Sequence, residues 1–218
     1  MKKNFANILL ILLAITLLIG GYLYFNNGAR VRTLNYFEPV EKALQGHNDS
    51  AGRFITYDFS LTDQTGATLT RSNFNNSIYV ADFFFTSCQG ICPRMNDQMQ
   101  RVYTKYKGNK EVQFISHTVN PENDSVSVLK EYADRRHADA SQWHFVTGDK
   151  TQLYMLARKS YLISNTTGDG GKEDFVHSQN FALVDKEGHI RGLYDGLDSI
   201  EVDRLMVDMD VLLLEYKK

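Results

Sequence analysis

The feature that most constrains the fold is an apolar run that ends in two cysteines. Residues 78–85 (IYVADFFF) are apolar with one exception, a pattern typical of a strand buried on both faces of a sheet. A short polar turn, Cys88 and Cys92 follow, and then a helical pattern over residues 94–107. This order predicts a central strand, a turn and a helix start beside the thiols, where unpaired N–H groups and the helix dipole favour a thiolate.

The spacing of the cysteines restricts their chemistry. Cys88 and Cys92 are the only cysteines in the 218-residue chain. A helical turn places both sulfurs on one side, with Cα atoms about 6 Å apart. That separation suits a disulfide and equally suits two thiolates that bind one soft metal ion. A purely structural disulfide is disfavoured, because so short a loop constrains the unfolded chain little.

The order of the remaining elements predicts the fold class. Strands are predicted at residues 54–61, 67–70, 111–119, 143–146, 180–185 and 189–194, and helices from Asp124 or Ser125 to about 137, at 149–162 and at 199–216. Strand and helix alternate first, and an antiparallel hairpin and a closing helix follow. We therefore expect an α/β fold: a thioredoxin-like central mixed sheet with helices on both faces and an additional N-terminal β-hairpin. The cysteines would then lie at the carboxyl end of a central strand, where open sheets bind ligands.

A histidine is the expected third member of the site. In a thioredoxin-like fold, the loop before the late hairpin approaches the cysteine turn, and redox enzymes of that fold carry a cis-proline there. This chain has His177 in that loop, and its prolines are at positions 39, 93 and 121. Two thiolates and an imidazole suit copper, either Cu(I) or Cu(II). Residues 164–174 are polar and glycine-rich and predict a mobile surface loop, so we expect His177 to swing in when metal binds.

Other residues have competing interpretations. Asp82 interrupts the apolar strand, and it either assists thiol proton transfer, acts as a weak auxiliary copper ligand, or reaches solvent at a strand edge. Met95 and Met99 follow Cys88 and Cys92 at helical spacing, so they lie on the same face of the predicted helix. We expect both to pack in the core rather than to bind copper. The histidines that form no spacing pair with the cysteines are expected to be structural or on the surface: His47, His117, His137, His144 and His189.

The N-terminus predicts membrane attachment. Residues 5–25 carry no charge and would form a helix of about 32 Å, which matches the hydrocarbon core of a bilayer. We therefore expect a membrane anchor at 1–25, a tether at 26–53 and a thioredoxin-like domain at 54–218. Paired cysteines on an anchored domain favour the non-cytoplasmic side, which is the periplasm in a bacterium. The formal net charge of −2 argues against nucleic acid as a partner.

At three separated segments the chain resembles the Sco/SenC copper-binding proteins. Residues 81–93 (ADFFFTSCQGICP) match F-T-x-C-x-x-x-C-P, residues 118–124 (TVNPEND) are similar to S-V-D-P-E-x-D, and His177-Ser178 with Leu183-Val184-Asp185 is similar to H-S…L-V-D. The resemblance implies copper binding through Cys88, Cys92 and His177, and a role in assembling the CuA site of cytochrome c oxidase as copper donor, thiol reductant or both. Two departures are Asn120, where the family usually has Asp, and the few acids near His177, which are Glu173 and Asp174.

Two functions of different class remain open. The first is a copper metallochaperone, not an enzyme, whose partners are the copper-bearing subunit of cytochrome c oxidase and other copper chaperones or thiol reductants. The second is a thiol–disulfide oxidoreductase that cycles Cys88 and Cys92, with His177 tuning the thiolates. A weaker third is peroxide reduction by one activated cysteine. The missing cis-proline disfavours ordinary disulfide exchange, and a structural zinc site would need a fourth ligand.

Overall fold

The computed structural model describes residues 13–20, 32–39, 47–164, 168, 171 and 174–217. The chain divides into two compact units, Met1–Thr33 and Leu34–Lys218. In the first unit, residues 13–20 are helical. Within the described parts of the chain, every helix is too short or too polar to cross a bilayer. The predicted anchor at residues 5–25 lies largely outside the described residues.

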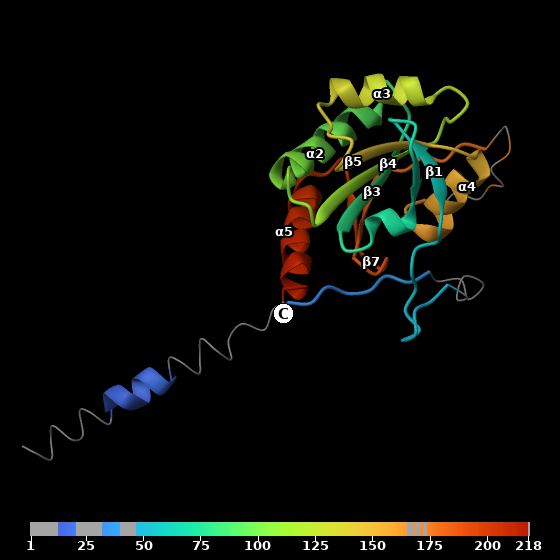
Figure 1. Cartoon of the computed structure of the whole chain (residues 1–218). Coiled ribbons are helices and arrows are strands. Elements are labelled where there is room, and N and C mark those ends of the chain that lie inside the picture. Colours follow the sequence, from blue (N-terminus) through green and yellow to red (C-terminus); the bar gives the residue numbers. More distant parts are fainter. Residues whose placement is uncertain are drawn as a thin grey trace, which may run out of the picture. The chain divides into compact units, whose positions relative to one another are not determined.

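The described part of the second unit contains a seven-stranded mixed sheet in the order β2-β1-β5-β4-β3-β6-β7 (Figure 1). The strands are β1 Ser60–Asp63, β2 Thr68–Thr70, β3 Ile78–Phe84, β4 Val112–Thr118, β5 Trp143–Thr147, β6 Asn180–Val184 and β7 Ile190–Asp195. Strands β3, β4 and β5 run parallel, whereas β1 is antiparallel to β5 and β6 is antiparallel to β3. Because β3 has a partner on each side and all its residues are buried, its apolar run is explained by burial on both faces.

Helices cover both faces of the sheet. The helices are α2 Ile91–Tyr106, α3 Val126–Arg135, α4 Lys150–Met155 and α5 Ser199–Glu215, with a 3-10 turn η2 Arg71–Phe74 and a π-helical turn η3 Leu156–Ser160 that continues α4. Helices α2, α3 and α5 lie on one face of the sheet and α4 on the other (Figure 1). Val80 and Phe84 of β3 pack with α2, α3 and α5, whereas Tyr79 and Phe83 pack with α4 and η3. This alternation confirms the predicted fold class. Met95 and Met99 are buried in the first of these clusters, as expected of core residues.

The folded unit extends further toward the N-terminus than residue 54. Leu34 is buried, its N–H donates to the Glu215 carboxylate over 2.8 Å, and Phe37 forms an isolated bridge with Ile190. The first sheet strand begins only at Ser60. The segment that contains Leu34 and Phe37 is irregular and packs through single contacts, so its residues show no periodic pattern. For this reason the sequence predicted a tether there.

Candidate functional site

The carboxyl end of β3 opens into a cavity of about 270 Å³ that contains both cysteines and the predicted histidine. It is lined by Phe83, Phe84, Phe85, Cys88, Gly90, Ile91, Cys92, Val119, Val176, His177 and Ser178. The register between β3 and β6 explains why His177 lies near the two cysteines. Ala81 of β3 lies opposite Ala182 of β6. Four residues after Ala81 is Phe85, just beyond the end of β3, and four residues before Ala182 is Ser178, just before the start of β6. The loop before β6 therefore runs beside the cysteine turn.

The two thiols differ in their electrostatic surroundings. Cys88 is half-buried, Cys92 is buried, and both are free thiols. Burial raises the pKa of Cys88, but hydrogen bonds from the Cys92 thiol and from backbone N–H groups at the start of α2 outweigh it and hold that pKa below its usual value. Burial and the adjacent Cys88 raise the pKa of Cys92 to about 12. Cys88 is therefore the more readily ionised of the two thiols, and the Cys92 thiol stabilises its ionised form.

We expect the two thiols to react at different rates with an alkylating agent. In the reduced, metal-free protein at neutral pH, iodoacetamide should modify Cys88 at least about tenfold faster than Cys92, because reactivity follows thiolate fraction and exposure. Time-resolved peptide mass spectrometry measures both rates in one sample. Cys92 in a Cys88→Ser variant serves as the control and should stay slow. Equal rates in the wild-type protein would contradict the assignment of Cys88 as the more readily ionised thiol.

A buried carboxylate holds the cysteine turn in place. Asp124 accepts hydrogen bonds from the Thr86 backbone N–H over 3.2 Å, from the Thr86 hydroxyl over 2.5 Å, and from the Thr118 hydroxyl. It thereby ties the turn after β3 to the end of β4. Sequence reasoning offered Asp124 or Ser125 as the helix cap. Ser125 caps α3 by accepting from the Val128 N–H, and the positioning role of Asp124 was missed.

Asp82 is fully buried behind the thiols. Its Oδ1 accepts a hydrogen bond from the Ser116 hydroxyl over 2.5 Å, and its Oδ2 has no hydrogen-bond partner among the described residues. Burial raises the pKa of Asp82 to about 7, although the Ser116 hydrogen bond opposes the rise. The interpretation that its side chain reaches solvent at a strand edge is wrong, because β3 is an interior strand. Asp82 also does not line the cysteine cavity, which disfavours a role as copper ligand.

His177 lies at the mouth of the cavity and is exposed. Its ring contacts Phe175 at 4.7 Å between centroids, and Phe175 packs edge-on against Phe85 at 5.3 Å. Most of the preceding loop that was predicted to be mobile lies outside the described residues. Across the described parts, one group of three His, Cys, Asp or Glu side chains has all its ligand atoms within 4.8 Å, and it does not include His177. The imidazole must therefore move toward the thiols before all three can bind one ion.

The group that meets this distance criterion is Asp185, Glu187 and His189. His189 Nδ1 lies 3.0 Å from Asp185, its Nε2 lies 3.0 Å from Asp49, and the Arg191 guanidinium pairs with Asp185 at 3.1 Å. Both ring nitrogens are thus engaged, and a cation already compensates the carboxylate. This cluster is an ion-pair network that joins the N-terminal segment to the sheet.

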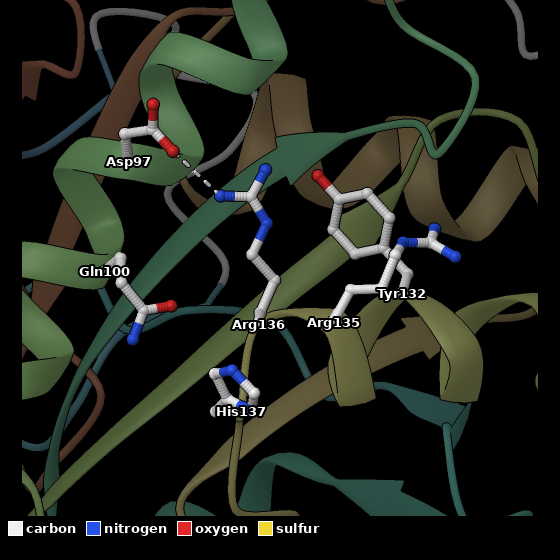
Figure 2. A pocket seen from close by; sticks show the side chains of 6 residues that line it. All are labelled: Asp97, Gln100, Tyr132, Arg135, Arg136 and His137. Carbon is white, nitrogen blue, oxygen red and sulfur yellow. Dashed lines mark hydrogen bonds and ion pairs between the residues drawn. The ribbon is translucent and has the colours of Figure 1, made fainter.

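A second cavity, of about 550 Å³, lies between α2 and α3 (Figure 2). It is lined by Asp97, Gln100, Tyr132, Arg135, Arg136 and His137. The Arg136 guanidinium and the Asp97 carboxylate form an ion pair at 3.1 Å across it. Its lining contains neither a thiol nor a thioether, so this cavity offers no soft sulfur donor to a copper ion.

Comparisons with known proteins agree with this site. The SCO1/SenC family model matches residues 47–208, which include both cysteines and His177. A SCO1 protein homolog of Bacillus subtilis (strain 168) is 29% identical over 153 residues, covering 69% of this chain and 79% of the relative. A putative copper-binding protein of Stutzerimonas stutzeri is 27% identical over 135 residues, covering 61% and 65%.

A solved structure extends the agreement to the fold. BsSco, reported with a disulfide switch and as a member of the Sco family of cytochrome c oxidase assembly proteins, superposes with a TM-score of 0.64 at 26% identity. The superposition covers 83% of this chain and 98% of BsSco. Since the family model spans most of the folded unit, the chain belongs to the SCO1/SenC family.

Proposed function

We propose that this protein is a copper metallochaperone that acts in assembly of the CuA site of cytochrome c oxidase, with Cys88, Cys92 and His177 as copper ligands. The observation that carries the proposal is that His177, which is distant in sequence from the two cysteines, shares one cavity with both of them. The copper-binding relative and the oxidase-assembly role of BsSco support it. The partner is then the copper-bearing subunit of the oxidase, with other copper chaperones or thiol reductants upstream.

The donor set suits the cargo. Two thiolates suit Cu(I), and the imidazole adds a ligand that also suits Cu(II). Cys88, whose pKa is lowered, gives up its proton more readily, whereas Cys92, whose pKa is raised, must release its proton as copper binds. Because Asp82 does not line the cavity, we place it behind the thiols as a group that influences the Cys92 proton rather than as a fourth ligand.

The proposed location is the non-cytoplasmic side of a membrane, the periplasm in a bacterium. Its support is the uncharged stretch at residues 5–25, which is long enough to anchor the chain. In intact spheroplasts, added protease should digest the domain from Leu34 onward, and a cytoplasmic marker enzyme should survive. A domain that is digested only after lysis would contradict this location.

Replacing His177 tests the ligand assignment. Adding one equivalent of Cu(II) to the reduced full-length protein should produce sulfur-to-copper charge-transfer absorption. His177→Ala should lower the Cu(II) affinity by about tenfold or more and change that spectrum, because one ligand is lost. His137→Ala, in the cavity between α2 and α3, is the matched control and should bind as the wild type does. A His177→Ala protein with wild-type Cu(II) affinity and spectrum would remove His177 from the site.

The second candidate is a thiol–disulfide oxidoreductase that cycles Cys88 and Cys92. The observation in its favour is the lowered pKa of Cys88 beside a second thiol, the arrangement of an attacking thiolate. Deleting the gene in the native host and assaying oxidase activity separates the two. Rescue by added copper supports delivery, and rescue by an external thiol reductant supports redox maturation.

A further inference from the structure

The backbone that precedes His177 is held by a nearly buried ion pair. The Arg158 guanidinium contacts both carboxylate oxygens of Asp174, at 2.7 and 2.6 Å, and the two side chains are only 10% and 8% exposed. A two-point arginine–carboxylate contact fixes orientation as well as distance. Arg158 lies in the π-helical turn η3, and such turns occur frequently at functional sites.

Two further contacts from the same segment hold the residues on either side of His177. The Tyr154 hydroxyl donates to the Val119 carbonyl over 2.7 Å, and the Val176 N–H lies close enough to that hydroxyl to oppose the rise in its pKa. The Ser178 hydroxyl donates to the Ile163 carbonyl over 2.7 Å. Residues 154–163 therefore restrain the chain before and after His177, while its imidazole remains exposed at the mouth of the cavity.

We propose that Arg158 is a positioning residue for copper binding, which acts through Asp174 to hold the His177 loop within reach of the thiols. The inference rests on the proposed role of His177 as a ligand. With Asp174 and Ser178 held, closing the site requires only a short local movement of residues 175–177. Without the ion pair the loop samples more conformations, and copper binding must restrict all of them.

Three substitutions break the pair in different ways. Arg158→Lys keeps the charge and removes the planar two-point contact. Asp174→Asn keeps the shape and removes the charge. Gly168→Ala acts from outside the pair, because a Cβ atom at Gly168 would lie 2.4 Å from both Asp174 carboxylate oxygens. Lys186→Gln is the matched control, since it breaks the Lys186–Glu111 pair, which lies at the opposite end of the sheet strands.

The metal-free protein gives a readout that does not depend on copper. Amide hydrogen exchange at Val176, His177 and Ser178 should be about tenfold or more faster in Arg158→Lys and Asp174→Asn, because a charged hydrogen bond no longer restrains the loop. Exchange in the core strand β3 should be unchanged, which shows that the variants are folded. Lys186→Gln should leave the loop exchange unchanged. Wild-type exchange at these amides in both Arg158→Lys and Asp174→Asn would overturn the proposal.

The copper readout separates positioning from general destabilisation. Each pair-breaking variant should bind Cu(II) about tenfold or more weakly, as is typical when a residue behind a ligand is lost. In a His177→Ala background the same substitutions should have no further effect, because the two changes act on one interaction. Equal losses in both backgrounds, or wild-type affinity despite faster loop exchange, would overturn the positioning role. If His177→Ala itself bound Cu(II) as the wild type does, the ligand assignment under the proposed function would fail instead.

Discussion

Replacing Cys92 by serine is expected to abolish tight copper binding. A serine hydroxyl does not ionise near neutral pH and is a hard donor, so one of the two soft ligands is lost. For scale, the ligands of a structural zinc site in a zinc-finger peptide together contribute about 10–16 kcal/mol. Loss of one ligand should therefore weaken Cu(I) binding by about a hundredfold or more, and remove most of the charge-transfer absorption with Cu(II). Competition with a chromophoric Cu(I) chelator measures the affinity, and Cys88→Ser should behave similarly.

Met95→Leu is the matched control for the cysteine variants. Met95 is also a soft sulfur donor on α2, but it is buried in the core and does not line the cysteine cavity. Its replacement conserves volume and should cost less than about 1.5 kcal/mol of stability, with copper affinity unchanged. Retention of tight Cu(I) binding by Cys92→Ser would show that the copper site does not include this thiol.

Asp82→Asn is expected to stabilise the metal-free protein at neutral pH. A rise in the pKa of Asp82 from 3.8 to about 7 corresponds to about 4 kcal/mol of preference for the neutral form in the folded state. The folded protein keeps the proton when the unfolded chain has lost it, so the stabilising contribution is complete below pH 4 and is lost as pH rises toward 7. Asparagine has no such pH dependence. Because its amide N–H₂ lacks a ready partner, the net gain at pH 7.5 should be about 2 kcal/mol.

Urea unfolding at several pH values measures this difference. Trp143 is the only tryptophan in the chain, is buried, and donates its ring N–H to Ser116, so its fluorescence reports unfolding close to Asp82. The advantage of Asp82→Asn should grow between pH 4.5 and 7.5. Asp134→Asn, at an exposed pair with Lys130, is the control and should show no growing advantage. A difference between Asp82→Asn and wild type that stays constant with pH would contradict the buried, proton-holding state of Asp82.

The local parts of the structure were predictable from residue patterns. The apolar run of β3, the turn and the start of α2 are short-range features, because burial on both faces and a helix start each leave a signature within about ten residues. The sequence located the first sheet strand too early, since the segment from Phe54 onward carries strand-like residues but packs through an isolated bridge. It also missed the packing of Leu34 and Phe37, because contacts with Glu215 and Ile190 leave no local pattern.

Around the thiols, too, some features were predictable from the sequence and others depended on tertiary contacts. The sequence by itself determined the fold class, the pair of thiols at the end of a buried strand, and a histidine in the loop that this fold brings toward them. The tertiary structure alone decided that Asp82 is sealed from solvent, that Asp124 holds the cysteine turn, and that Arg158 restrains the His177 loop. Burial and charge pairing depend on which distant segments meet, and a linear pattern encodes only neighbours along the chain. The sequence alone therefore identified the candidate donor atoms, which are the two cysteine sulfurs and the His177 imidazole. The pKa values of the thiols and the restraint on the His177 loop depend on tertiary packing.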